Sequence, residues 1–383
     1  MKRFLLWLNR AGYAGLLRPL IFRTSSAQQA HAHMLRLLCF ADGQPWLAGL
    51  LAALRQAMMP PAPVEVGGVC LDHPLILAAG LVKGEGFADE AAALAAVQAG
   101  RDIIPGWRTI PALAGPVEFG SYTRWPRLGN PGTVLWRDPA TGSTQNRVGL
   151  RNPGVLAAAA FLGARKHELP AQFGINIAVS PSVDDPDRQT EEVLASLRAF
   201  LDRGVYPTWF TLNLSCPNTE DDPGGNQTAD LAEQLCGAAV TCLREAEAAA
   251  GQAIPLWVKV GPDLSTTQYR ALLRVFAAVG VRAVIATNTL GLPAPGDETL
   301  TAGVGGGRLH APALAAVRAL MEEQAAGSWP VDVIGCGGVL DGTTYRNFAA
   351  LGVRAAQYWS ALVYRGPYAA ALIQAEMAEG NRE

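Results

Sequence analysis

The chain has 383 residues, of which 50% are hydrophobic and 17% are charged, and its formal net charge is -2 at pH 7. This composition excludes a disordered protein and predicts one large domain with a substantial core. The near-neutral charge gives no general field for a polyanion, so we expect no nucleic-acid partner. The six cysteines form no CxxC pair and no His-linked ligand spacing, so we expect neither a metal site nor a disulfide framework.

The first 60 residues are basic and apolar, and we expect them to form a separate helical segment. Six lysines and arginines precede Asp42, which is the first acidic residue. The arginines interrupt every apolar run before it reaches the ~20 residues that a membrane span needs, and no signal-peptide cleavage pattern follows the first run. Helices are predicted at about 25–40 and across the apolar stretch 46–54.

Two interpretations of residues 1–60 fit this composition equally well. In the first, apolar side chains such as Phe4 and Trp7 enter a bilayer while arginines meet anionic head groups, so that the segment lies on the membrane surface. In the second, the helices pack on the main domain or on a second subunit.

From residue 73 onward, short aliphatic runs alternate with Ala- and Leu-rich stretches, a pattern typical of repeated βα units. Eight units predict a closed (β/α)8 TIM barrel over residues 61–383, with 1–60 as an N-terminal helical extension. An open doubly wound sheet is the alternative, but no GxGxxG motif opens the first helix. The predicted strands are 73–80, 101–107, 173–179, 209–215, 256–260, 283–289, 331–337 and 355–360, and predicted helices include 190–201, 229–249, 266–278, 312–325 and 343–350.

Polar residues follow these predicted strands, where a barrel places its active site. Five asparagines at strand ends and in loops offer paired donors and acceptors for a planar amide or imide, although a single Asn is more often a turn or cap residue. Lys83 and Lys259 would supply positive charge for a carboxylate or for a reduced flavin, or are simply solvated rim lysines. The asparagines are Asn146, Asn176, Asn213, Asn218 and Asn288, and the Gly- and Pro-rich excursion 108–172 is expected to cover this face.

Cys216 and two glycine clusters complete the candidate site. Pro217 ends the fourth strand directly after Cys216, whose thiol is a plausible proton acceptor, although a Cys is more often a small buried hydrophobe. Glycines let backbone N–H groups approach an anion, and these clusters follow the sixth and seventh strands, where barrels commonly hold phosphate. The clusters are Gly303, Gly305, Gly306 and Gly307, and Gly335, Gly337 and Gly338.

In this order, seven segments resemble the dihydroorotate dehydrogenases, flavin-dependent barrels of pyrimidine synthesis. They are LAAGLVK at 77–83, NRVGLRNPG at 146–154, GINI at 174–177, NLSCPNT at 213–219, VKVGPDLS at 258–265, ATNT at 286–289 and IGCGGV at 334–339. The resemblance runs from about residue 17 to residue 367.

The resemblance implies that FMN lies across the barrel mouth with dihydroorotate or orotate stacked on it. It assigns the general-base position to Cys216, which would take the C5 proton while a hydride passes from C6 to the flavin. The implied FMN contacts are Ala79, Gly80, Lys83, Asn176, Asn213, Lys259, Thr287, Gly307, Gly338, Trp359 and Ser360. The implied substrate contacts are Lys83, Asn146, Arg147, Val148, Gly149, Leu150, Asn213, Asn218, Asn288 and Thr289.

The N-terminal segment is similar to that of the membrane-associated, quinone-dependent class, class 2, of this family. LRPLIFR at 17–23, Ala30-His31 and the apolar run 35–38 carry this likeness, which implies a membrane quinone as acceptor and a peripheral position on the cytoplasmic face of a bacterial inner membrane. Cys216, however, is the base of the soluble class, since class 2 normally carries Ser there. Further departures from the family are Val82 beside Lys83, Trp107 in place of a small hydroxyl residue at the flavin, and Ala178-Val179 in place of Gly-Lys.

Three functions therefore remain open from the sequence. The first is a quinone-linked dihydroorotate dehydrogenase, which the complete substrate set favours. The second is an FMN barrel that oxidises another cyclic amide, and the third is a catalytically silent, membrane-bound FMN protein.

Overall fold

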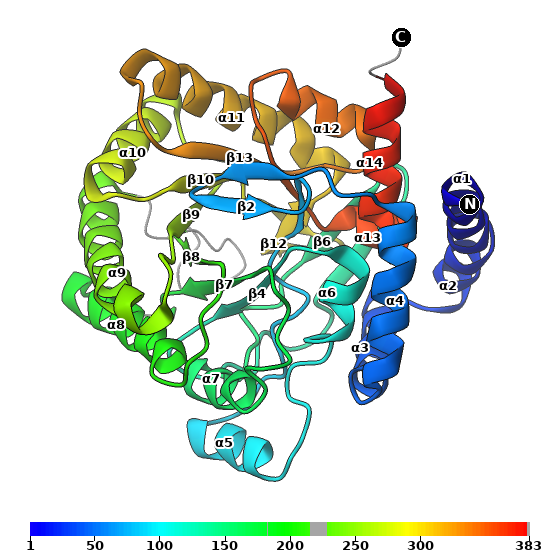
Figure 1. Ribbon diagram of the computed structural model, residues 1–383, viewed down its shortest axis with the longest axis horizontal. Helices are drawn as coiled ribbons and strands as arrows, with labels where there is room; N and C mark the ends of the chain where they lie inside the picture. The colour runs from blue at the N-terminus through cyan, green and yellow to red at the C-terminus, as the bar shows by residue number, and fades with distance from the viewer. Residues whose placement is uncertain (182, 215–227, 381–383) are drawn as a thin grey trace.

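Eight parallel strands close into a barrel in the computed structural model, which describes residues 1–181, 183–214 and 228–380 (Figure 1). Each strand pairs in parallel with its neighbours, and the order around the barrel is β10-β13-β14-β3-β4-β7-β8-β9. The predicted TIM barrel is confirmed. The strands are β3 (Leu75–Leu77), β4 (Val117–Tyr122), β7 (Phe173–Ala178), β8 (Trp209–Asn213), β9 (Leu256–Val260), β10 (Ala283–Ala286), β13 (Asp332–Cys336) and β14 (Ala356–Tyr358).

The predicted strand 101–107 is wrong, because the second barrel strand is β4, inside the excursion 108–172. Ile103 and Ile104 are fully buried, but they lie in an irregular segment that leads to the next helix. A short apolar run indicates that its residues are buried, but it does not show whether their backbone forms a strand or an irregular segment. The sequence comparison placed Trp107 at a flavin-contacting position because it took 101–107 as a strand. In the structure, the Trp107 ring packs edge-on against Phe161 in the core, with centroids 6.0 Å apart.

Helices surround the barrel, and local signals fix where several of them begin and end. Ser265 and Gln268 form a capping box at the start of α10, and Gly280 ends that helix in the left-handed conformation that glycine tolerates best. Gly251 ends α9 in the same way. The helices after the first strand are α5 (Glu90–Gln98), α6 (Thr109–Ala114), α7 (Val155–Gly163), α8 (Pro186–Leu201), α9 (Ala229–Ala250), α10 (Thr266–Val279), α11 (Gly307–Gly327), α12 (Gly342–Ala349), α13 (Ser360–Arg365) and α14 (Ala369–Gly380).

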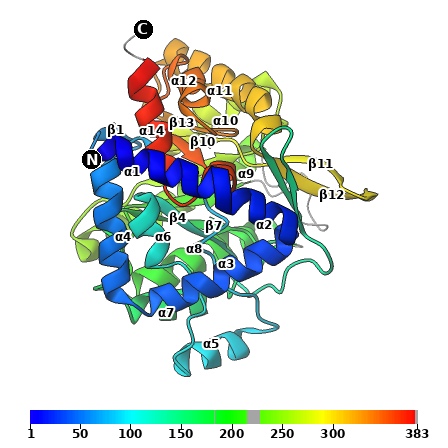
Figure 2. The ribbon, with the colours of Figure 1, turned by 90° about the vertical axis from the view of Figure 1, so that its right-hand side faces the viewer.

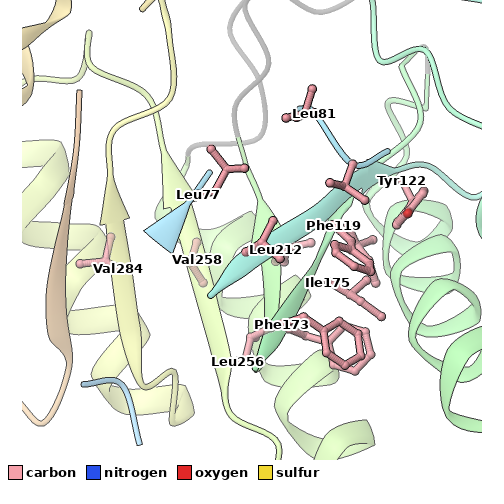
Figure 3. Packing of buried hydrophobic residues seen from close by; sticks show 14 of the residues in the cluster. Leu77, Leu81, Phe119, Tyr122, Phe173, Ile175, Leu212, Leu256, Val258 and Val284 are labelled. Atoms are coloured by element: carbon pink, nitrogen blue, oxygen red, sulfur yellow. The ribbon is translucent and has the colours of Figure 1, made fainter. Parts of the chain in front are cut away.

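Successive side chains of each strand point to opposite faces of the sheet, so the barrel has an outer and an inner set. The outer set packs against the helices, as Phe119, Ile175 and Leu212 do in Figure 3. The inner set begins with an apolar layer in which the rings of Trp209 and Trp257 stack 4.4 Å apart.

A hairpin, β1 (Val64–Val66) and β2 (Val69–Leu71), packs on the apolar layer inside the barrel. Trp257 donates its indole N–H to the carbonyl of Gly67 at 3.0 Å. A Cβ on Gly67 would lie 2.3 Å from that ring, so only glycine lets the turn approach so closely.

A small antiparallel sheet brings two distant loops together. Its order is β11-β12-β6-β5, built from β5 (Leu135–Asp138), β6 (Ser143–Asn146), β11 (Leu290–Ala294) and β12 (Asp297–Gly305). The register places Asn146 opposite Gly303. Residues from the excursion 108–172 therefore meet the glycine cluster that follows the sixth barrel strand.

The N-terminal extension lies along one side of the barrel (Figure 2). It consists of a continuous helical run, α1 (Lys2–Asn9), η1 (Arg10–Leu17) and α2 (Arg18–Thr24), followed by α3 (Ala27–Asp42) and α4 (Pro45–Met58). The run is tied to α13 where Tyr13 and Arg18 donate hydrogen bonds to the carbonyls of Val363 and Tyr364. α3 is tied more firmly, because the Asp42 carboxylate accepts bonds from the backbone at the start of α6.

Within the described ranges, none of the individual helices is long and apolar enough to cross a membrane. α3 and α4 together have the required length and composition, but they are bent by 107°.

Candidate active site

A cavity of about 640 Å³ lies between the carboxyl ends of the barrel strands and α3. Parts of the small antiparallel sheet complete its wall. The predicted site residues that line it are Ala79, Gly80, Lys83, Asn146, Val148, Lys259, Thr287, Asn288, Thr289, Gly338, Trp359 and Ser360. Members of the predicted substrate set and of the predicted flavin set thus line one space.

Among the described residues, five other predicted contacts and Gly307 are not in the cavity lining. Asn176 is buried within β7, and Asn213 is buried at the end of β8, where it accepts a hydrogen bond from the lining residue Asn288. Arg147 is buried and donates to the carbonyl of Pro131. Gly149 and Leu150 follow in a tight turn with positive φ, and Gly307 begins α11. Cys216 and Asn218 lie outside the described residues, so their assignments stay predictions.

One end of the cavity is a cradle of backbone groups. Gly306 and Gly338 approach each other so closely that a Cβ on Gly338 would lie 2.8 Å from the Gly306 carbonyl. α11, of 21 residues, begins directly after Gly306, and its dipole favours an anion, although Arg308 and Leu309 already donate their backbone N–H groups to Ser143 Oγ and the Gly306 carbonyl. The hydroxyls of Ser360 and Thr144 lie 2.7 Å apart at the same end. The cavity reaches Gly305 and Gly306, rather than the Gly307 that the resemblance assigned.

The floor of the cavity is a polar layer above the stacked tryptophans. Lys259, from β9, donates to Gln357 Oε1 at 2.9 Å, and Gln357 Nε2 donates to Glu118 Oε2 at 2.9 Å. β9 and β14 are separated by two strands in the barrel, and β14 and β4 by one, so these bonds cross the interior. The layer holds one cation and one carboxyl group out of contact with bulk water.

Amide groups gather between this floor and the small sheet. Asn288 donates from Nδ2 to Asn213 Oδ1 at 3.3 Å, and its own Oδ1 accepts from the Thr289 backbone N–H at 2.8 Å. Asn146 stands on β6, in the opposite wall. Such groups can read the donor and acceptor edges of a cyclic amide.

The wall that α3 contributes is neutral at its centre. Burial, and then the charges of Lys83 and Arg151, lowers the pKa of His31 to about 4. Leu35 and Cys39 continue this wall along the helix. Gln28 fixes the start of the helix to the loop before β5, because it donates to the Gly132 carbonyl and accepts from the Val134 N–H.

The residues present fit a ring cofactor that carries a phosphate. The cradle suits the phosphate, and the buried ammonium of Lys259 suits a ring that gains negative charge on reduction. Both side-chain amide atoms of Asn176, and the hydroxyl of Thr289, are buried with no hydrogen-bond partner in the described part of the chain. Buried polar atoms are normally paired, so these are open positions for a ligand. Among residues 1–181, 183–214 and 228–380, no cluster of three His, Cys, Asp or Glu side chains could hold a metal ion.

The fold and the cavity fit the class of flavin-binding barrels. The family model described as dihydroorotate dehydrogenase matches residues 62–380. The chain therefore belongs to the dihydroorotate dehydrogenase family.

Among curated proteins, the chain is similar to two that are named dihydroorotate dehydrogenase (quinone). That of Salinispora arenicola is 33% identical over 374 residues, which cover 95% of this chain and 97% of the relative. That of Chromobacterium violaceum is 32% identical over 361 residues, which cover 92% and 94%. Both matches reach into the N-terminal extension, because the barrel alone is shorter than either aligned length.

Two crystal structures of DHODH from Eimeria tenella have the same fold. The complex with ferulenol matches with a TM-score of 0.69 at 21% identity, covering 89% of this chain and 91% of that one. The ligand-free structure matches with a TM-score of 0.68 at 21% identity, covering 89% and 96%.

The sequence analysis missed two candidate functional residues, Glu118 and Gln357. Each stands in a strand between apolar neighbours, where a polar residue is typical of a solvent-facing position. The available signal was the register of β4, since Glu118 would face inward if strand two were placed at 117–122.

Proposed function

We propose that this protein oxidises dihydroorotate to orotate in pyrimidine biosynthesis and passes the electrons to a membrane quinone. The observation that carries the proposal is a single cavity with the predicted substrate and flavin residues at its strand ends and α3 in its wall. The match to the family over residues 62–380 and the quinone-dependent relatives support the same reaction.

FMN is the cofactor that we propose. Gly306, Gly338 and the start of α11 would hold its phosphate, and Lys259 would lie beside its ring. Bound FMN supplies a two-electron acceptor for the substrate and a donor for the quinone. The other steps belong to the chain: Asn146 and Asn288 orient the cyclic amide, Asn213 holds Asn288 in place, and Cys216 removes a proton from the carbon next to the oxidised centre.

We propose that the quinone reaches the cavity along α3. His31, Leu35 and Cys39 would form its path, and the low pKa of His31 keeps that side chain uncharged beside an apolar quinone, while Arg36 of the same helix also lines the cavity. The exposed apolar side chains of α1 and α2, with their arginines, would hold the enzyme on an anionic membrane surface, at the cytoplasmic face in a bacterium.

Anaerobic mixing tests both half-reactions. Purified protein loaded with FMN should lose its flavin absorbance when dihydroorotate is added, and a long-chain quinone in detergent should restore it. Protein that refuses FMN would contradict every flavin function. If FMN is bound but dihydroorotate does not bleach it, dihydroorotate is not the substrate, and the alternative of another cyclic amide is favoured.

A further inference from the structure

We propose that Glu118 and Gln357 are positioning residues for Lys259, and that Glu118 sets the charge balance that a bound flavin meets at the cavity floor. Glu118 is fully buried in the barrel interior. Its Oε1 accepts from Trp209 Nε1 at 3.2 Å and from the Thr211 hydroxyl, and its Oε2 accepts from Gln357 Nε2 at 2.9 Å.

The partners of Glu118 favour a charged carboxyl group. An indole N–H can only donate, and it points at one carboxyl oxygen. Lys259 can only donate, so it takes the oxygen of the Gln357 amide and turns the NH2 group toward the other carboxyl oxygen. Each carboxyl oxygen thus accepts a hydrogen bond from a group that can only donate, and such bonds favour the carboxylate over the protonated acid.

Stability alone gives no reason for this arrangement. A buried charge pair usually contributes no more to folding than well-packed apolar side chains of the same size. Here the side-chain amide of Gln357 bridges the Glu118 carboxylate and the Lys259 ammonium, and of these two charged groups only the ammonium reaches the cavity. Gln357 thus holds the Lys259 amine in one place, and the Glu118 charge offsets part of its field.

This inference rests on the proposed function, because its effect appears on a bound flavin. With Glu118 neutral, the charge of Lys259 would be less compensated, and the reduced, more negative ring would be favoured. We expect Glu118→Gln to raise the reduced-to-oxidised equilibrium of bound FMN about tenfold, which is about +30 mV for a two-electron couple. Spectroelectrochemical titration of the holoenzyme measures this shift.

Matched variants separate charge from packing. Thr211→Val removes a hydrogen bond to the same carboxylate but keeps its charge, so it should lower stability and leave the potential unchanged. Gln357→Leu cuts the bridge, leaves the bound ring as the acceptor for Lys259, and should raise the potential. It also tests the proposal if Glu118→Gln does not fold. An unchanged potential in Glu118→Gln or Gln357→Leu would overturn the proposal.

A second comparison asks whether Glu118 acts through Lys259. In a Lys259→Met background, Glu118→Gln should shift the potential less than in the wild type, because only the direct field of the carboxylate on the ring remains. A shift of the same size in both backgrounds would mean that Glu118 acts by its own field, and the positioning role would be wrong.

Flavin-free protein provides a test that is independent of the proposed function. Urea unfolding of wild type, Glu118→Gln, Lys259→Met and the double variant forms a cycle. Glu118→Gln should be strongly destabilising alone and much less so with Lys259→Met, because the buried cation is then gone. Additive effects would contradict the link between the two residues, whatever the protein oxidises. A coupled cycle in a protein that does not react with dihydroorotate would contradict only the proposed function.

Discussion

Proton removal from the substrate depends, in our proposal, on Cys216. An unperturbed thiol has a pKa near 8.5, so a useful fraction is ionised near neutral pH, whereas a hydroxyl is much harder to ionise. We expect Cys216→Ala to slow flavin reduction by dihydroorotate ~10²-fold or more, the usual contribution of a positioned base, and to leave FMN bound. Anaerobic stopped-flow absorbance measures both properties.

Cys216→Ser is the conservative control for that substitution. It should retain part of the rate, with its optimum at higher pH than the wild type. If the alanine variant reduced its flavin at the wild-type rate, another group would be the base.

Single residues also show how far the sequence could predict the site. The lysines and asparagines at strand ends were found because a barrel interior seldom needs such groups for packing, and most of them line the cavity. Glu118 and Gln357 were missed, because their partners come from strands far away in the sequence and the register of β4 was the available signal. A hydrogen bond across the barrel leaves no local pattern.

At the scale of elements, the contact between α3 and α6 joins the extension to the barrel. Asp42, at the end of α3, accepts hydrogen bonds from the backbone N–H groups of Gly106 and Thr109 and from the Thr109 hydroxyl. Burial, and then the neighbouring Asp42 carboxyl, raises the pKa of Asp102 to about 7. One carboxyl of this pair therefore keeps its proton in the folded protein at mildly acidic pH.

This pair makes stability depend on pH in a defined direction. An unfolded Asp releases its proton near pH 3.9, whereas folded Asp102 keeps it up to about pH 7. Between these values the folded state holds the extra proton, so the free energy of unfolding should fall as pH rises through this window. Asp102→Asn should reduce that fall and be more stable than wild type at pH 8. Urea unfolding at pH 5 and pH 8 measures it, and equal pH dependence in both proteins would contradict the assignment.

The elements themselves were mostly predictable, since seven barrel strands overlap the predicted ranges. The exception is informative. Residues 103–107 are as buried as a strand but form irregular chain that leads to α6, while β4 carries Glu118 and so lacks a continuous apolar run.

At the scale of the whole molecule, the extension combines two parts with different relations to the barrel. α3 and α4 contribute Leu38 and Met58 to the main core, so they are needed for its packing. The run 2–24 has no buried residue. The packing interpretation of the N-terminal segment therefore holds for α3 and α4. The run 2–24 packs more lightly, through Leu5 and Leu6, and carries the exposed apolar side chains that we propose meet a membrane.

Substitutions in that run test the membrane surface without removing the packed helices. Phe4, Trp7 and Leu8 are 61%, 61% and 51% exposed. Changing all three to Ser should weaken binding to vesicles of phosphatidylglycerol and phosphatidylcholine, because the apolar area that enters the bilayer is lost. The binding that remains should fall as salt is raised, since it depends on Arg10 and Arg23. Trp125→Ser, on a barrel loop with the same 51% exposure as Leu8, is the matched control and should bind as wild type.

The catalytic readout of the same triple variant separates membrane binding from chemistry. Reduction of FMN by dihydroorotate should keep its wild-type rate, because the barrel alone carries that step. Reoxidation by a long-chain quinone held in vesicles should slow in proportion to the lost binding, whereas a short, water-soluble quinone should react as before, since the path along α3 is intact. If the triple variant bound vesicles and used the long-chain quinone as well as wild type does, the first helical run would not be the membrane contact. Equal slowing with both quinones would instead mean that this run shapes the quinone path itself.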